Sequence, residues 1–443
     1  MRVLIDYRPA LRERSGVGEY AHQLVRALLR TFPANESGVS HGPLDLTLFS
    51  SSWKDRLHPL PDIAAARTID RRVPVRVLNF AWHRLRWPPV ETLAMRRFDV
   101  THSLHPLVMP ARNAAHVITI HDLHFLTHRE RTRAEIRRDY AALAHANARR
   151  ADHVITISQF SAREIERRLG VPSDRISICP PGAPDWTPRT GQPKNGYVLF
   201  FGTLESRKNV GGLLDAYECL TSQTRRTGVP DLVLAGKATD AAQVWLDRIA
   251  RPPLAGRVRH IGYVEPANRR ALYEGARLLV QPSFDEGFGI PVLEAMTLGV
   301  PVVASSRGAL PEVLGDAGLL VDPEDRDGMA GAIQRMVDDD AFAAACAAKG
   351  VLRSRERTWE LTARRVFDAY QQAIEARTAR LRGSRSGAQG APGPTEPGSE
   401  AEPRALGAHS APARERSGAQ GSPRATEPGS GAEPRPDKDA HRH

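Results

Sequence analysis

The sequence predicts an α/β protein of two domains, and three observations lead to this prediction. The chain has 443 residues, which is long enough for two domains and further segments. Short apolar runs, typical of buried strands, alternate along the chain with helical runs. Loops that contain glycine follow several of these runs, at the positions where α/β folds form their pockets.

The first domain is expected to cover residues 1–190. It begins with a strand at Val3–Asp6, which Gly16 and Gly18 follow before a helix at Ala21–Leu29. Two glycines before a helix can admit a ligand or simply form a turn. Further strands are predicted at 100–103, 116–120, 152–157 and 175–179, and a helix at 133–151.

The second domain is expected to cover residues 195–358, after a linker that begins at Pro180–Pro184, where regular structure is broken. Its buried strands are predicted at 197–201, 258–261, 278–280 and 300–304, with a further strand and turn at 231–237. Apolar residues at helical spacing then predict a last helix at 359–380.

Two adjacent cations follow the 197–201 strand. Arg207 and Lys208 stand directly before a helix that starts near Val210. Cations oppose the dipole at a helix N-terminus, so their presence there favours a bound phosphate. Ordinary surface charge is the alternative, but the position after a strand favours the phosphate.

Residues 278–304 read as one strand–loop–helix–strand unit around Gly287 and Gly289. These glycines let the backbone approach a ligand closely, and the amides at the helix start can hold a diphosphate. Glu286 and Glu294 can both face this pocket, where a carboxylate can accept two hydroxyl protons from the vicinal diol of a ribose or hexose. A helix cap or a solvated side chain is the better explanation for either glutamate alone, but not for the pair around Gly-Phe-Gly-Ile-Pro.

The run Glu286–Glu294, which reads EGFGIPVLE, resembles the E-x7-E motif of retaining glycosyltransferases of family GT4, which have the GT-B fold. The resemblance continues to Pro323 and is strongest over Phe200–Pro323, which makes it far more specific than a lone glycine pattern. It implies two Rossmann-like domains that face a cleft. The first domain would shape the acceptor site, and the second would bind a nucleotide-sugar.

The resemblance also implies roles for single residues of the central motif. Glu294 would bind the nucleotide ribose, and Glu286 would contact the donor sugar. The amides of Gly287, Phe288 and Gly289 would lie near the sugar and the phosphates.

Other family positions are matched elsewhere in the chain. His121 corresponds to a histidine at a strand end that lies beside the donor sugar in the reaction centre. Gly16 and Gly18 match a glycine-rich loop after the first strand, and Val264 belongs to the turn near the base.

The family's diphosphate contacts are matched with one departure. Lys208 corresponds to the family lysine. The family arginine often follows the glycine directly, but that position here is Thr203, so Arg207 is expected to replace it.

No metal and no cofactor other than the donor substrate are expected. His121, His124 and His128 are close in sequence, but no cysteine or carboxylate cluster accompanies them. No Asp-x-Asp motif stands at a suitable position, so the reaction is predicted to require no metal. The three cysteines form no metal or disulfide pattern, which indicates a reducing compartment.

The net charge of +11 favours an anionic partner, and composition alone admits nucleic acid, anionic lipid or a nucleotide-sugar. No nucleic-acid module accompanies the charge, so nucleic acid is not expected as a partner.

Residues 71–97 interleave seven arginines with Phe80, Trp82, Leu85 and Trp87. This pattern suits an anionic membrane surface, and an ordinary solvated face with its aromatics turned inward is the alternative. No secretory signal or bilayer-spanning run is found. The protein is therefore expected in the cytoplasm, with the family implying peripheral contact at the inner face of the cell membrane.

The expected activity is transfer of a hexose, with retention of its anomeric configuration, to a saccharide or lipid-linked acceptor. The motif style resembles bacterial mannosyltransferases of O-antigen and exopolysaccharide assembly, which favours GDP-mannose as donor and leaves UDP-sugars open. The alternatives are a GT-B epimerase or phosphorylase and a non-catalytic nucleotide-sugar-binding protein. A dehydrogenase would need G-x-G-x-x-G directly after a strand, which the chain lacks.

Residues 383–443 differ from the rest in composition, which is dominated by Gly, Pro, Ser, Ala, Glu and Arg. The run SGAQG at 386–390 recurs at 417–421. Such a segment buries too little apolar surface to fold, so the sequence predicts a disordered tail without a catalytic role.

Overall fold

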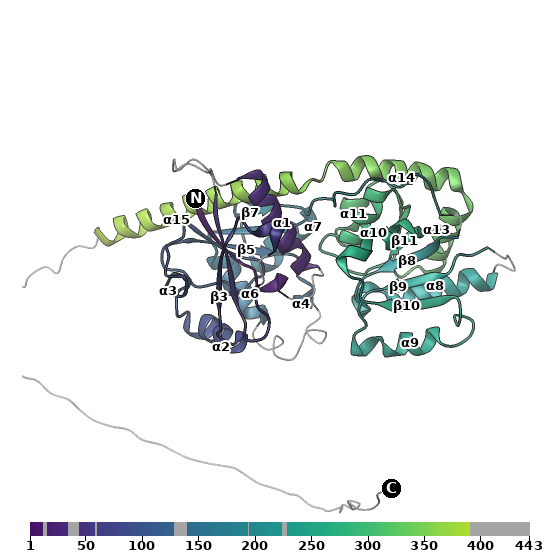
Figure 1. Cartoon of the computed structure of the whole chain (residues 1–443), viewed down its shortest axis with the longest axis horizontal. Coiled ribbons are helices and arrows are strands. Elements are labelled where there is room, and N and C mark those ends of the chain that lie inside the picture. The colour runs from purple at the N-terminus through teal and green to yellow at the C-terminus, as the bar shows by residue number, and fades with distance from the viewer. Residues whose placement is uncertain are drawn as a thin grey trace, which may run out of the picture. The chain divides into compact units, whose positions relative to one another are not determined.

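The computed structural model describes residues 1–11, 16–33, 44–57, 60–127, 140–193, 195–223 and 228–389. Met1–Gln389 forms one compact unit, which contains two parallel β-sheets with helices around them (Figure 1). From residue 390 onward, the predicted tail lies outside the described residues.

The first sheet has seven strands in the order β3-β2-β1-β4-β5-β6-β7, and all neighbouring strands are parallel. They are β1 (Arg2–Asp6), β2 (Asp45–Ser51), β3 (Arg67–Arg71), β4 (Val100–Ser103), β5 (Ala115–Ile120), β6 (His153–Thr156) and β7 (Ile176–Ile178). The chain order reverses between β1 and β4, and sheets of this kind bind ligands at the carboxyl ends of the strands near such a point.

The second sheet has six parallel strands in the order β10-β9-β8-β11-β12-β13. They are β8 (Tyr197–Phe201), β9 (Leu232–Ala235), β10 (Val258–Gly262), β11 (Ala276–Gln281), β12 (Val302–Ser305) and β13 (Leu319–Val321). Here the order reverses between β8 and β11, the two strands that the predicted cations and Glu286 follow.

Helices connect the strands of both sheets. Those of the first domain are α1 (Val17–Thr31), α2 (Val75–Phe80), α3 (Val90–Ala94), α4 (His124–Thr127), α6 (Tyr140–Arg150) and α7 (Gln159–Leu169). Those of the second are α8 (Val210–Gln223), α9 (Gln243–Ile249), α10 (Pro266–Glu274), α11 (Ile290–Leu298), α12 (Leu310–Leu314), α13 (Arg326–Asp338) and α14 (Asp340–Arg355). The last helix is α15 (Trp359–Gln389).

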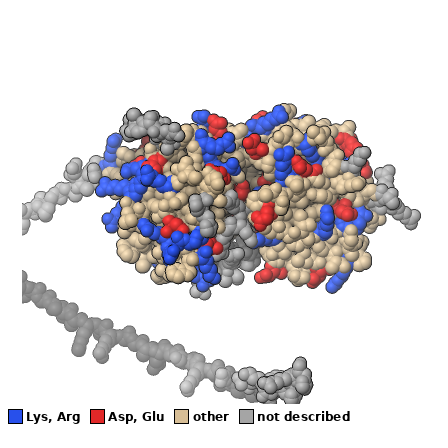
Figure 2. All heavy atoms as spheres, in the orientation of Figure 1, with Lys and Arg blue, Asp and Glu red and all other residues tan. Residues whose placement is uncertain are grey.

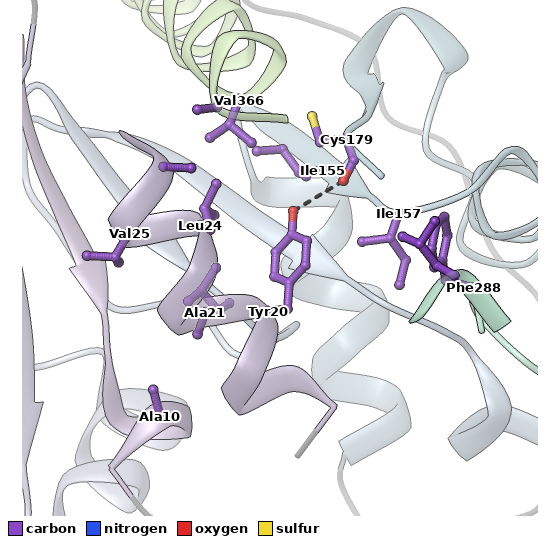
Figure 3. Close-up of a cluster of buried hydrophobic side chains, with 14 of the residues drawn as sticks. Ala10, Tyr20, Ala21, Leu24, Val25, Ile155, Ile157, Cys179, Phe288 and Val366 are labelled. Carbon is purple, nitrogen blue, oxygen red and sulfur yellow. Dashed lines mark hydrogen bonds between the residues drawn. The ribbon is translucent and has the colours of Figure 1, made fainter. Parts of the chain in front are cut away.

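Apolar residues at helical spacing bury one face of α1. Tyr20, Leu24 and Leu28 lie on this face and are all buried, as a stripe that repeats every three to four residues requires. Figure 3 shows the Tyr20 ring among apolar side chains, with its hydroxyl donating to the carbonyl oxygen of Cys179 at 3.3 Å.

The helix α15 packs against α1 and against β5, β6 and β7 of the first sheet, although it follows the second domain in sequence (Figure 1). A hydrogen bond of 2.8 Å joins the Tyr370 hydroxyl to Nδ1 of His102 on β4. Phe367 stacks on Phe32 with ring centroids 4.4 Å apart. The helix ends at Gln389, beyond the end at residue 380 that its apolar spacing predicts.

Candidate active site

A cavity of about 440 Å³ lies at the carboxyl ends of both sheets. Its wall from the first domain consists of Gly16, Val17, Glu19, Tyr20, His121, Asp122, Ile157 and Pro181. The second domain contributes loops that follow β8, β9, β10 and β11. The cavity thus lies where parallel sheets of this topology bind ligands.

Lys208 and Glu286 form a buried ion pair in this cavity. Lys208 follows β8, Glu286 follows β11, and these two strands are neighbours in the sheet. Lys208 Nζ donates to Glu286 Oε1, which also accepts from Ser283 Oγ at 2.9 Å and from Gln281 Nε2 at 3.1 Å. The sheet topology therefore brings together charges that are far apart in the chain.

Arg207 supplies a second cation beside the pair. Its Nε lies 2.7 Å from a carboxylate oxygen of Glu205, and its NH1 lies 3.5 Å from Glu286 Oε2. Burial raises the pKa of Glu286, but Lys208 and Arg207 outweigh this effect and lower that pKa to about 2. Glu286 is therefore ionised at neutral pH, between two cations.

The Glu294 carboxylate is held by two side chains of α10. Arg269 NH2 lies 2.6 Å from its Oε1, and the Tyr273 hydroxyl donates to its Oε2 at 2.8 Å. Burial nevertheless raises the pKa of Glu294. Arg269 lines the cavity described above, whereas Glu294 lines a neighbouring cavity of about 850 Å³ that Arg269 also borders.

The loop before α11 needs glycine at two positions. Gly289 has a φ of +104°, which side chains other than glycine rarely adopt. A Cβ atom on Gly287 would lie 2.3 Å from the carbonyl oxygen of His121, so no side chain fits between the two loops. The helix α11 therefore begins at the edge of the cavity, and the amides of Val292 and Leu293 donate to the carbonyl oxygen of Gly289 at 3.0 and 3.2 Å.

His121 follows β5 and faces the cavity from the first domain. Its ring packs edge-on against Tyr20, with centroids 5.0 Å apart. Burial lowers the pKa of His121 to about 4, so the ring is neutral at pH 7. Its Nε2 atom is buried and has no hydrogen-bond partner within the described part of the chain, which leaves it suited to a ligand hydroxyl.

Further contacts join the domains beside this cavity. Ser161 Oγ lies 3.1 Å from the carbonyl oxygen of His121 and 3.4 Å from that of Gly287. His124 Nδ1 lies 3.4 Å from the Asp285 carboxylate. Figure 3 also shows Phe288, from the glycine loop, beside Ile157 of the first domain.

Comparison with known proteins identifies the family. The model for "Glycosyltransferase Family 4" matches residues 14–185, and that for "Glycosyl transferases group 1" matches residues 195–339. The O-antigen chain mannosyltransferase B of Escherichia coli is 30% identical over 392 residues, which cover 84% of this chain and 100% of that relative. The chain is a group 1 glycosyltransferase of family GT4.

More distant proteins share the architecture of this transferase. A glycogen synthase of Mycobacterium tuberculosis is 28% identical over 377 residues, covering 77% of this chain and 87% of the relative. The structure of sucrose-phosphate synthase from Thermosynechococcus elongatus aligns with a TM-score of 0.68 at 21% identity, over 85% of this chain and 99% of the other. These likenesses confirm the predicted GT-B fold.

Most of the site residues predicted for the transferase lie in the one cavity. These are Gly16, His121, Arg207, Lys208, Val264, Glu286, Gly287, Phe288 and Gly289. Two predicted residues lie elsewhere. Gly18 is buried against Pro9, whose carbonyl oxygen would be 2.7 Å from a Cβ atom at Gly18, and Glu294 lines the neighbouring cavity. Thr203 also lines the main cavity, where Arg207 provides the cation.

Arg269 is a residue of the site that the sequence analysis missed. A single arginine on a helix does not indicate a binding site, because most helical arginines are solvated. The spacing of Arg269 from Tyr273 could have indicated a shared partner, since residues four apart lie on the same face of a helix. Asp122, Lys237 and Glu19 also line the cavity without having been predicted.

The segment 71–97 of the transferase turns aromatic side chains both inward and outward. Trp82 is buried, and its Nε1 donates to the carbonyl oxygen of Pro88 at 3.0 Å. Phe80, Leu85 and Trp87 are 62%, 63% and 64% exposed. Basic and acidic side chains are interspersed over the visible face of the molecule (Figure 2). Exposed apolar side chains therefore stand among the exposed arginines of this segment.

Neither a membrane span nor a metal cluster occurs in the part of the chain that the structure describes. No helix there is long and apolar enough to cross a bilayer. No group of three His, Cys, Asp or Glu side chains there is placed to hold a metal ion. His128 lies outside the described residues.

Proposed function

We propose that this transferase moves a hexose from a nucleoside diphosphate sugar to a saccharide or lipid-linked acceptor and retains the anomeric configuration. The observation that carries the proposal is the Lys208–Glu286 ion pair, with Arg207 beside it, in a cavity that borders a helix N-terminus. A diphosphate can replace the carboxylate as partner of these cations, because both are anions that accept several hydrogen bonds.

In this proposal the second domain stabilises the leaving group. Arg207 and Lys208 neutralise the negative charge that develops on the diphosphate as its bond to the sugar breaks. The dipole of α11 adds partial positive charge at the same edge of the cavity, where this helix begins. Groups fixed in place before the reaction are effective here, and removal of one such donor typically costs about 3–4 kcal/mol of transition-state stabilisation.

Glu286 and His121 orient the sugar. Once the diphosphate engages Lys208, Glu286 accepts hydrogen bonds from hexose hydroxyls. His121, neutral and with Nε2 unpartnered in the described structure, bonds a sugar hydroxyl from the other domain. The acceptor oxygen attacks on the face that the phosphate leaves, and its proton passes to that phosphate.

GDP-mannose is the proposed donor. The relative that covers this chain over 84% of its length is an O-antigen chain mannosyltransferase, which supports mannose transfer in surface polysaccharide assembly. Glu294 is proposed to bind the ribose of this donor, since its carboxylate can accept further hydrogen bonds beside those from Arg269 and Tyr273.

The proposed acceptor is presented at an anionic membrane on the cytoplasmic side. Phe80, Leu85 and Trp87 are exposed close in sequence to five exposed arginines. The arginines are Arg72, Arg76, Arg84, Arg86 and Arg97. Aromatic rings at headgroup level with arginines beside them are typical of peripheral membrane contact.

Thermal unfolding with nucleotides tests the donor. GDP and GDP-mannose are expected to raise the melting temperature more than UDP and UDP-glucose at equal concentration. A ligand at a hundred times its Kd stabilises the folded state by about 2.7 kcal/mol. The K208M variant is expected to lose this response, and no response of the wild type to any nucleotide would contradict the proposal.

Product analysis tests the reaction. Incubation with GDP-mannose and a mannosylated acceptor is expected to yield a glycosylated acceptor with an α-linkage, and a chelator is expected to leave the rate unchanged. An epimerised nucleotide-sugar or a free sugar phosphate as the main product would instead favour an epimerase or a phosphorylase.

A further inference from the structure

The second domain holds the first turn of α7, a helix of the first domain. Glu312 of α12 accepts hydrogen bonds from the backbone amides of Gln159, at 2.9 Å, and Phe160, at 3.1 Å. Amides at a helix N-terminus have no partner within the helix and favour a negative charge. An acidic side chain of one domain therefore caps a helix of the other.

The capped turn reaches the active-site cavity through Ser161. Ser161 N donates to Ser158 Oγ at 3.0 Å, which completes the cap. The Ser161 hydroxyl lies between two carbonyl oxygens, that of His121 at 3.1 Å and that of Gly287 at 3.4 Å. One buried serine thus links the loop that carries the cavity imidazole to the glycine loop of the second domain.

Two arginines fix Glu312 in this position. Arg353 donates to the carbonyl oxygens of Glu312 and Val313, both at 2.8 Å. Arg357 donates to the Glu312 carbonyl oxygen at 3.2 Å. These contacts hold the backbone of Glu312 and leave its carboxylate to the amides of α7.

We propose that Glu312 is a positioning residue for sugar transfer. It fixes the first turn of α7, the turn fixes Ser161, and Ser161 holds the His121 loop against the Gly287 loop. The inference rests on the proposed function, which gives His121 its role at the donor sugar. Arg207 and Lys208 belong to the second domain, so loss of the cap should lower turnover and leave nucleotide binding intact.

Kinetics of the full-length E312A variant test this inference. Because small displacements of catalytic groups are costly, kcat is expected to fall about tenfold to a hundredfold. The Kd of the nucleotide is expected to change by less than about twofold. Loss of an interaction that acts only in the transition state lowers kcat and leaves ground-state binding unchanged. E312Q keeps one acceptor oxygen and is expected to recover part of the lost kcat.

The matched control is Glu356. This exposed side chain lines the same groove as Glu312, so E356A removes the same charge but leaves the cap of α7 in place. Its kcat is expected to equal that of the wild type.

A double variant and hydrogen exchange test whether Glu312 acts through the first turn of α7 and Ser161. S161A and E312A act through one turn, so their combined effect on kcat is expected to be smaller than the product of the single effects. E312A is also expected to speed amide exchange at residues 159–161, since local opening becomes easier.

An unchanged kcat in E312A, an equal loss of nucleotide affinity, or unchanged exchange in α7 would each overturn the inference. A wild-type protein that neither binds nor uses nucleotide-sugars would refute the proposed function instead. The exchange experiment would still decide whether Glu312 caps α7.

Discussion

At the scale of single residues, the cavity holds charges that are buried and mutually compensated. Lys208 and Glu286 are 8% and 6% exposed, so each depends on the other for the interactions that water would otherwise provide. This arrangement is costly to disrupt on one side only, because the remaining charge stays buried.

The first prediction concerns this compensation. K208M leaves Glu286 with the more distant Arg207 as its remaining cationic partner. The free energy of unfolding is therefore expected to fall by about 3 kcal/mol. The double variant K208M/E286Q should be less affected, since neither buried charge remains. Urea unfolding measures both variants. The control is K349M, which removes an exposed ion pair with Asp316 and is expected to unfold like the wild type.

The second prediction concerns acid stability. The pKa of Glu286 is lowered from the ordinary 4.5 to about 2 in the folded protein. Its contribution to stability is therefore complete above pH 4.5 and is lost as the pH falls toward 2. E286Q should reduce the dependence of the unfolding free energy on pH across this window, by about 3 kcal/mol in total. Equal slopes for wild type and E286Q between pH 5 and 3 would contradict the prediction.

Residues with a distinctive pattern were predictable from the sequence, whereas residues with generic chemistry were not. The glycines, glutamates and cations of the two loops stand at positions that the strand pattern and the family motif mark. Arg269, Ser161 and Glu312 resemble any helical residue of their type. Their partners lie far away in sequence, so only the folded chain shows what they contact.

At the scale of elements, α15 is the helix that ties the end of the described chain to the first sheet. Burial lowers the pKa of His102 to about 3, so its ring is neutral. One ring nitrogen bonds the Tyr370 hydroxyl and the other bonds Thr119 Oγ1 at 2.7 Å. The contact supplies a buried polar link between the helix and β4.

The third prediction tests this link. Y370F leaves Nδ1 of His102 buried without its partner and is expected to lower the free energy of unfolding by about 1–3 kcal/mol. The matched control is T378A, an exposed residue of the same helix, which should change stability by less than about 0.5 kcal/mol. A Y370F value equal to that control would show that the link does not stabilise the docked helix.

The strands predicted from apolar runs are present, and β2, β3 and β13 were missed. The buried strand β8 has the predicted bounds, 197–201. The edge strand β3 reads RTIDR and contains one apolar residue, so no hydrophobic pattern marks it. The helix α15 continues through Gly383, where composition alone predicts an end, because extending a formed helix adds one hydrogen bond for each residue fixed.

At the scale of the whole molecule, the exposed apolar side chains of segment 71–97 allow a test of the membrane contact proposed above. The fourth prediction is that the wild type sediments with vesicles that contain phosphatidylglycerol and not with phosphatidylcholine alone. Added salt should weaken the binding, since part of it is electrostatic.

The double variant F80S/W87S is expected to lower vesicle affinity at least about tenfold, because each aromatic ring contributes about 1.5–3 kcal/mol when removed from water. The control is L352S, which replaces an equally exposed leucine, 63% accessible, on the second domain. Equal losses for the two variants would place the contact elsewhere.

The predicted tail is tested separately. A chain that ends at Gln389 is expected to keep its nucleotide affinity.

The chain passes between the two domains twice, and the two passages touch. Ala183 N donates to the carbonyl oxygen of Arg357 at 2.7 Å, and a Cβ atom on Gly182 would lie 2.2 Å from Trp359 N. Because the two passages are in contact, neither can shift without displacing the other. A side chain larger than hydrogen at position 182 would force them apart.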